Sequence, residues 1–315
     1  MISTSDLAAI LGAALLAAFG GEAFLKGVLG VASWLRVPKL LVATTLAAFA
    51  TSSPELTVSS IAALAGKPEI GLGDVLGSNV VNIALIFGLA LLFGSIRAQR
   101  GELGRDFVLA LLTPLATLLF AADGEISRIE GGLLLLIFVG WMGMVIRAGL
   151  AAREVSAPTD DTARHGAALL FGLGGLAALI LAGRLFVTGA SGIATALGID
   201  AYTVGVTVVA IGTSLPELVT VLLARLRGHD EIGIGTLLGS NLFNGLAIVG
   251  VAASIHPIQA PLTEITITIA FGVAAVLLMI PNRADLITRS RGILLIAVYI
   301  GFILATLIAS RSIPI

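Results

Sequence analysis

The sequence of 315 residues is 57% hydrophobic and only 12% charged, with a formal net charge of −1. Its mean hydropathy is +1.08. Soluble domains are nearer half apolar and a quarter charged, so this composition excludes a disordered chain, a nucleic-acid binder and an ordinary soluble enzyme. The lack of cysteine excludes disulfides and thiolate metal sites. The sequence therefore predicts an all-α polytopic membrane protein embedded in a lipid bilayer.

Ten apolar segments are candidates for membrane-spanning helices, which need about 20 residues each. In chain order they cover 7–34, 39–65, 70–95, 107–121, 126–147, 166–197, 201–226, 231–253, 262–280 and 292–310. The fourth is short for a full crossing. The first has no Lys or Arg before it, so we interpret it as a retained span and not as a signal peptide. The polar stretch 148–165 then separates a first half, 1–147, from a second half, 166–315.

The positive charges are distributed unevenly between the two sides of this predicted bundle. Of the 18 Lys and Arg residues, 13 lie in loops after odd-numbered segments, three lie on the other side, and Lys26 and Arg184 lie within spans. Short cytoplasmic loops are enriched in positive residues. We therefore expect a cytoplasmic linker, both termini outside, and a location in the plasma (cell inner) membrane.

The chain repeats itself at an offset of 162 residues. Over residues 20–92, 29 of the 73 pairs aligned without a gap are identical, which indicates an internal duplication. Each half holds five spans, and an odd number makes the second half enter from the opposite side. The expected fold is therefore ten transmembrane helices in two inverted five-helix repeats, a plan common among secondary transporters.

Glu55 and Glu217 are matching acids near the middle of their apolar segments. A charge at such a position costs about 2.5–3.5 kcal/mol on insertion scales, so each needs a partner. A bound cation is the interpretation we favour over protonated glutamates bonded to a neighbouring helix. Other oxygen groups recur around both acids at spacings that share a helix face. They are Thr51 and Thr213, Ser78 and Asn82, and Ser240 and Asn244.

A proline precedes each glutamate. Proline donates no N–H and clashes with the carbonyl four residues earlier, so Pro54 frees the carbonyl of Ala50. Pro216 does the same for Gly212. Together these groups predict an all-oxygen site, which suits hard cations such as Ca²⁺ and Na⁺ and disfavours Zn²⁺ and Cu²⁺.

These motifs resemble the two alpha-repeats of the calcium/cation antiporter superfamily, and are most similar to those of bacterial and archaeal sodium/calcium exchangers. The matching runs are 51–55 with 77–79, and 212–217 with 239–241. The resemblance implies that spans 2, 3, 7 and 8 hold the ions and that spans 1 and 6 slide across them.

By position, the resemblance implies Ca²⁺ ligands at Glu55 and Glu217 and at the backbone carbonyls of Thr51 and Thr213. It implies that Asn82 and Asn244 flank this central site. The implied Na⁺ ligands are Ser52 and Ser78 in one half, Ser214 and Ser240 in the other, and carbonyls near Ala50. Many sodium/calcium members have an aspartate at one of the two asparagine positions, and proton-coupled relatives carry an acid in that helix. The two asparagines here argue against proton coupling.

The resulting hypothesis is an antiporter, not an enzyme, that exchanges Ca²⁺ for Na⁺ by alternating access. It needs no organic cofactor and no obligatory protein partner, and an ion gradient supplies the energy. A Ca²⁺/H⁺ exchanger is the nearest alternative, and a cation channel is another. An intramembrane hydrolase is disfavoured because the chain lacks HExxH and GxSxG motifs.

Two weaker patterns complete the predictions. Glu22 and Lys26 are one helical turn apart in the first span and are expected to pair. Trp34 and Trp141 lie toward the ends of their spans, where tryptophan often anchors a helix at the membrane interface.

Overall fold

A computed structural model describes residues 3–152, 162–196, 210–260 and 262–311. The chain divides into two compact units. Unit 1 comprises Met1–Thr51 and Gly143–Thr236, and unit 2 comprises Ser52–Met142 and Leu237–Ile315.

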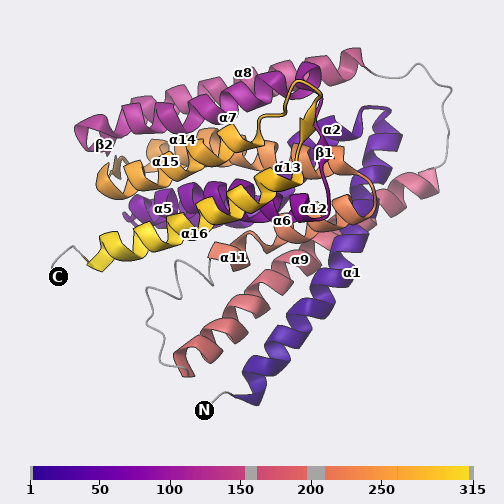
Figure 1. Ribbon diagram of the computed structural model, residues 1–315, viewed down its shortest axis with the longest axis horizontal. Helices are drawn as coiled ribbons and strands as arrows, with labels where there is room; N and C mark the ends of the chain where they lie inside the picture. Colours follow the sequence, from indigo (N-terminus) through magenta and orange to yellow (C-terminus); the bar gives the residue numbers. More distant parts are fainter. Residues whose placement is uncertain (1–2, 153–161, 197–209, 261, 312–315) are drawn as a thin grey trace. The chain divides into compact units, whose positions relative to one another are not determined.

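Unit 1 is built around two long helices, α1 (Thr4–Leu35) and α9 (Thr162–Ala196). They run side by side over much of their length (Figure 1). Glycines make this close approach possible. A Cβ atom built on Gly27 would lie 2.3 Å from Cα of Gly172, and one on Gly175 would lie 2.3 Å from the backbone nitrogen of Phe24. No larger side chain fits at these crossing points unless the helices separate.

Unit 1 also contains shorter helical segments. They are α2 (Lys39–Val42), the π-helical η1 (Ala43–Ala47), α3 (Ala48–Thr51), α11 (Ala210–Thr213), α12 (Leu215–Leu226) and the first part of α13 (Asp230–Leu242). The core joins Phe24 and Val28 of α1 to Leu179 of α9, Ala224 of α12 and Ile232 of α13.

Unit 2 is a larger helical bundle. Its first part contains α4 (Ser53–Leu64), α5 (Pro68–Val80), π-helical η2 (Val81–Phe87), α6 (Gly88–Leu92), α7 (Arg100–Phe120), the 3₁₀ turn η3 (Ala121–Asp123) and most of α8 (Arg128–Ala151). Its second part contains the end of α13, π-helical η5 (Phe243–Ile248), α14 (Val249–Ile255), α15 (Leu262–Met279) and α16 (Arg289–Arg311). The helix α15 packs on α5, α7 and α16, and α4 packs on α5, η5 and α14.

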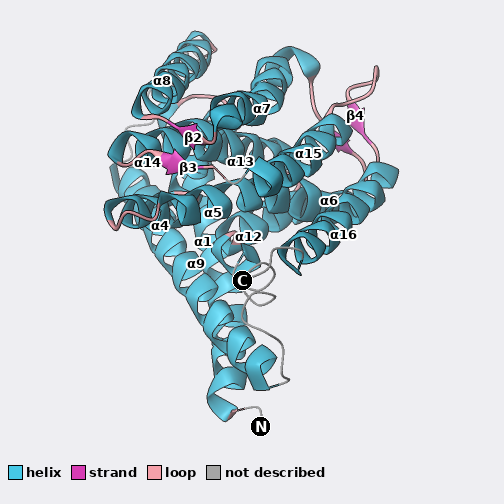
Figure 2. Ribbon diagram, turned by 90° about the vertical axis from the view of Figure 1, so that its left-hand side faces the viewer, coloured by secondary structure: helices cyan, strands magenta, loops and turns pink. Residues whose placement is uncertain are grey.

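Two very short antiparallel strand pairs correct the all-helical expectation. In unit 2, β1 (Ile96–Arg97) pairs with β4 (Leu286–Ile287), and β2 (Glu125–Ile126) pairs with β3 (Ile258–Gln259). Figure 2 shows the β2 and β3 strands next to each other. Each pair joins connections between helices that are far apart in the sequence. Two-residue strands carry no periodic hydrophobic pattern, which is why the sequence did not predict them.

Trp141 is also placed differently from the interfacial position predicted for it. Its side chain is buried in unit 2, and its Nε1 donates a hydrogen bond of 2.9 Å to Oδ1 of Asp106 on α7. Asp106, itself buried, also accepts a hydrogen bond of 3.1 Å from Nε of Arg105. The tryptophan therefore joins α8 to α7 within the bundle.

The secondary structure recurs at the sequence offset of 162. Adding 162 to the bounds of α4 gives those of α12, and adding it to the bounds of α5 gives those of α13. The π-helical segments η2 and η5 begin at equivalent positions, 81 and 243. Gly66 and Gly228 both have positive φ, 72° and 75°, after α4 and α12. Duplicated sequence segments thus adopt the same local structure, including its irregular parts.

Seven helices within the described ranges are long and apolar enough to cross a membrane: 4–35, 68–92, 103–123, 128–151, 165–193, 230–255 and 289–309. Two shorter apolar helical stretches, Lys39–Thr51 and Ile265–Met279, fall in the predicted second and ninth spans. Residues 201–209 of the predicted seventh span lie outside the described residues. The fold is therefore mostly helical, with seven candidate spans among the described residues, and the count of ten in inverted repeats stays a prediction.

Candidate cation-binding residues

The helices that carry the two glutamates are broken just before the proline. In unit 2, α4 begins at Ser53, and Ser52 ahead of it has φ −86° and ψ 6°. In unit 1, α12 begins at Leu215, and Ser214 has φ −84° and ψ 13°. Both pairs of dihedrals lie in the sparsely populated bridge region, where residues of functional sites often occur. Proline is favoured in the first turn of a helix, where its missing N–H is not needed. Each break thus lies two residues before one of the prolines noted in the sequence.

In unit 2, the broken helix packs against two of the segments that carry predicted serine and asparagine ligands. Glu55 lies in the first turn of α4 and is 1% exposed. The helix α4 contacts α5, which carries Ser78, and η5, which carries Asn244. At one point α4 approaches α5 closely. There Ser59 Oγ donates a 3.3 Å hydrogen bond to the carbonyl of Gly71, and a Cβ on Gly71 would lie 2.7 Å from Cα of Ser59.

All the predicted ligands of this unit are buried. They are Ser52, Glu55, Ser78, Asn82, Ser240 and Asn244. Among their oxygen atoms, Oγ of Ser78 and Oδ1 of Asn82 and of Asn244 have no hydrogen-bond partner within the described part of the chain. Buried polar atoms are normally hydrogen-bonded, so an unpartnered one needs an explanation. Such oxygens are ligands that a hard cation prefers.

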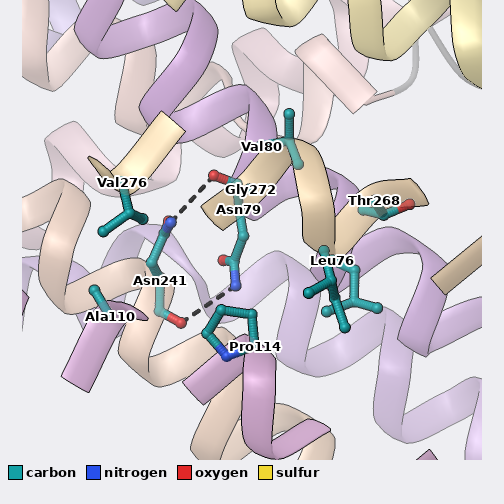
Figure 3. A pocket seen from close by; sticks show the side chains of 10 residues that line it. Leu76, Asn79, Val80, Ala110, Pro114, Asn241, Thr268, Gly272 and Val276 are labelled. Atoms are coloured by element: carbon teal, nitrogen blue, oxygen red, sulfur yellow. Dashed lines mark hydrogen bonds between the residues drawn. The ribbon is translucent and has the colours of Figure 1, made fainter. Parts of the chain in front are cut away.

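Four asparagines of unit 2 form one hydrogen-bonded network. Nδ2 of Asn79 donates to the main-chain carbonyl of Asn241 at 3.3 Å, and Nδ2 of Asn241 donates to that of Asn79 at 3.1 Å (Figure 3). Nδ2 of Asn82 donates to Oδ1 of Asn241 at 3.0 Å, and Nδ2 of Asn244 donates to Oδ1 of Asn79 at 3.0 Å. The two halves of the network are equivalent under the offset of 162 residues.

Asn79 and Asn241 were not among the functional residues predicted from the sequence, although both belong to the matching motifs. Their identity at equivalent positions in the two halves was a usable signal. They also line a small pocket between α5, α7, α13 and α15 (Figure 3), together with Pro114 and Thr268. The free space in this pocket is about 20 Å³, roughly the room that one water molecule needs.

Unit 1 holds the remaining predicted ligands. Glu217 in the first turn of α12 is 1% exposed, and Ser214 and Thr51 are also buried. Oγ of Ser214 has no hydrogen-bond partner among the residues described, whereas the Thr51 hydroxyl donates to the carbonyl of Ala48 at 3.3 Å. Gly212 is buried, and Ala50 and Thr213 are half-buried. A carbonyl ligand at Thr51 would leave its hydroxyl bond intact.

The helix α9 approaches the break between α11 and α12 closely. A Cβ on Gly183 would lie 2.6 Å from the carbonyl oxygen of Gly212, and one on Gly212 would lie 2.2 Å from Cγ2 of Val187. Gly212 is one of the two residues whose carbonyl the proline frees. A movement of α9 along its axis would therefore change the contacts of Gly212, which is a predicted ligand.

Glu22 lies in the middle of α1 and forms two ion pairs within unit 1. Its Oε1 is 3.6 Å from Nζ of Lys26, as predicted from their spacing, and its Oε2 is 2.9 Å from a guanidinium nitrogen of Arg227. The second pair ties α1 to the turn after α12. All three side chains are partly exposed, so these pairs contribute modestly to stability.

Comparison with known proteins decides the family. The sequence model described as sodium/calcium exchanger protein matches residues 5–147 and 167–308. The chain belongs to the sodium/calcium exchanger family. Its integral membrane location and its class, cation antiporters, follow from this membership and from the apolar helices.

Individual relatives are similar to this chain over most of their length. MaX1 of Methanosarcina acetivorans, named a sodium/calcium exchanger, is 26% identical over 345 residues, covering 96% of this chain and 98% of its own. The inner membrane protein YrbG of Escherichia coli is 35% identical over 232 residues, covering 70% of this chain and 71% of its own. A structure of the sodium/calcium exchanger from Methanococcus jannaschii matches with a TM-score of 0.82 at 27% identity, over 96% of this chain and 99% of the other.

Proposed function

We propose that this exchanger couples Ca²⁺ transport to Na⁺ and that the buried glutamates Glu55 and Glu217 hold the transported cations. The observation that carries the proposal is the burial of both carboxylates, each 1% exposed, beside a break in its helix. Burying an ionised carboxylate is costly unless a cation or hydrogen bonds compensate. Two carboxylates carry a charge of −2, which one Ca²⁺ neutralises.

The ligands proposed for this site are those expected from the sequence. Ca²⁺ is coordinated by the two glutamates and by the carbonyls of Thr51 and Thr213, with Asn82 and Asn244 beside them. Na⁺ is bound by Ser52, Ser78, Ser214 and Ser240 and by carbonyls of Ala50 and Gly212. The unpartnered oxygens of Ser78, Ser214, Asn82 and Asn244 support this assignment, because hard cations prefer such ligands.

Coupling to Na⁺ is favoured over coupling to H⁺ by the residues at positions 82 and 244. Both are asparagine, which supplies an oxygen dipole and cannot exchange a proton at neutral pH. A third carboxylate at either position would offer a proton acceptor next to the cations. The proposed site has none there, so proton competition is limited to the two glutamates.

The proposed membrane arrangement is ten spans in two inverted repeats, with both termini outside the plasma membrane. The recurrence of element bounds at the offset of 162 supports duplication. The strong bias of Lys and Arg toward odd-numbered loops supports the orientation. Binding of Na⁺ and of Ca²⁺ at overlapping ligands then makes transport of one depend on release of the other.

The experiment that tests the coupling ion is Ca²⁺ uptake into vesicles containing the purified protein. Uptake is driven either by an outward Na⁺ gradient without a pH difference or by a pH gradient without Na⁺. We expect saturable uptake with the Na⁺ gradient only. Uptake with the pH gradient alone identifies a Ca²⁺/H⁺ exchanger instead, and flux that needs no counter-ion on the far side identifies a channel.

A further inference from the structure

We propose that Asn79 and Asn241 are positioning residues that turn the carboxamide oxygens of Asn82 and Asn244 toward the transported cation. This inference rests on the proposed cation site. It assigns a role to two residues that are not themselves proposed as ligands.

A carboxamide has two chemically different ends of similar size. Its oxygen accepts hydrogen bonds and binds cations, whereas its NH₂ group only donates and repels a cation. Rotation by 180° exchanges the two ends. An asparagine at a cation site is therefore a ligand in one orientation and an obstacle in the other, so something must fix the orientation.

The orientation of Asn79 and Asn241 is fixed by the main chain. Each amide faces the main-chain carbonyl of the other residue, at 3.3 and 3.1 Å (Figure 3). A carbonyl oxygen can only accept, so the end that faces it must be NH₂. Oδ1 of each residue is consequently directed away from that carbonyl.

These two Oδ1 atoms in turn fix Asn82 and Asn244. Oδ1 of Asn241 accepts from Nδ2 of Asn82, and Oδ1 of Asn79 accepts from Nδ2 of Asn244, both at 3.0 Å. If the carboxamide of Asn82 or Asn244 rotated by 180°, its oxygen would face the oxygen of its partner at this distance. Asn82 and Asn244 are each 1% exposed, so water would not compensate for the lost bond.

Oδ1 of Asn82 and Oδ1 of Asn244 are consequently the ends of the two carboxamides that can bind a cation. Both are buried and have no hydrogen-bond partner among the described residues. The network thus presents two oriented oxygen dipoles to a cation without adding a charge. The pairing is crosswise: residue 241 orients residue 82, and residue 79 orients residue 244.

The crosswise pairing gives a specific test. Ca²⁺ binding is measured by titration calorimetry on the purified full chain for Asn241→Ala and Asn79→Ala. Loss of a residue that orients a metal ligand typically weakens binding about 10–100-fold, and we expect a loss of that order for each. Asparagine-to-serine variants at the same positions replace the alanine variants if those do not fold.

Aspartate at the oriented position removes the need for orientation, because both its ends are oxygens. We therefore expect Asn241→Ala to weaken Ca²⁺ binding by less than about threefold, or to strengthen it, when Asn82→Asp is already present, because Oδ1 of Asn241 then faces an aspartate oxygen in place of an NH₂ group. It should keep its full effect when Asn244→Asp is present. For Asn79→Ala the roles of the two aspartate variants are reversed. Each double variant is compared with its own single aspartate variant, so the added charge cancels.

Two failures can be told apart. If the wild type binds Ca²⁺ and exchanges it for Na⁺, but the alanine effects are the same in both aspartate backgrounds, the positioning role is wrong and the proposed function stands. If the wild type binds Ca²⁺ but a Na⁺ gradient drives no uptake, the proposed function is wrong while crosswise rescue is still measurable. A wild type that binds no Ca²⁺ overturns both.

Discussion

At the scale of single residues, most of the buried polar chemistry of this chain lies on side chains that the sequence marks by repetition. Glu55, Ser78 and Asn82 recur as Glu217, Ser240 and Asn244. All six are buried in the structure. A single polar residue in an apolar helix is ambiguous, but the same residue at matching positions of a duplicated chain indicates a shared use. Repetition alone does not indicate which asparagines are hydrogen-bonded to each other. The structure shows that Asn82 is bonded to Asn241 and Asn244 to Asn79.

Away from the cation site, the hydrogen bond between Trp141 and Asp106 is expected to stabilise the fold. The Nε1 donor of Trp141 is hydrogen-bonded at 2.9 Å to a carboxylate that is only 3% exposed. Trp141→Phe leaves that carboxylate with one bond fewer, and we expect a loss of about 1–3 kcal/mol in the free energy of unfolding. The measurement is thermal or denaturant unfolding in detergent.

Trp34→Phe is the matched control. Trp34 is 40% exposed and stacks on His165 at 4.8 Å, an arrangement that phenylalanine can largely retain. Its substitution should change stability by no more than about 0.5 kcal/mol. Equal effects of the two substitutions would show that the bond to Asp106 is not the stabilising contact.

These two tryptophans also show why the sequence predicts some placements and not others. Both occur near the ends of apolar segments, and the interfacial prediction applied equally to both. Only the tertiary structure distinguishes them, because Trp141 meets Asp106 from a helix 35 residues earlier in the chain. The breaks at Ser52 and Ser214 were predictable because their cause, the proline two residues later, is local.

At the scale of elements, the pair formed by α1 and α9 is held by backbone contact at glycines. Their lengths of 32 and 35 residues correspond to about 48 and 52 Å, well above the 30 Å of a bilayer core. Such long helices must tilt or project beyond the hydrocarbon region. Backbone contact at glycines and the shared core of Phe24, Val28 and Leu179 together hold the two helices as one pair.

Gly175→Ala tests this contact. A Cβ at this position would lie 2.7 Å from the carbonyl oxygen of Gly20 as well as 2.3 Å from the nitrogen of Phe24, and backbone atoms cannot move aside independently. We expect a destabilisation of about 1–3 kcal/mol, measured by thermal unfolding in detergent. The neighbouring Gly174→Ala is the control, because nothing lies within 4 Å of its added Cβ. If Gly175→Ala is as stable as Gly174→Ala, the close approach is not a constraint on the pair.

At the scale of the whole molecule, orientation in the membrane is the feature that charge predicts and that helix geometry does not. The chain has no cysteine, so single cysteines can be introduced without a background. A membrane-impermeant thiol reagent added from outside should modify a cysteine at Lys67 and spare one at Arg100 or Arg227. The opposite labelling pattern would reverse the orientation and leave the duplication unaffected.

The central claim is that Ca²⁺ exchange passes through a site built on Glu55 and Glu217, and the most direct measurement is Na⁺-driven Ca²⁺ uptake into vesicles by single variants. We predict that Glu55→Ala and Glu217→Ala each abolish uptake while the protein still inserts at normal levels, because each removes half of the charge that neutralises Ca²⁺. The control Glu69→Ala, at an exposed acid in the first turn of α5, should transport normally. Near-normal uptake by either of the first two variants would contradict the account.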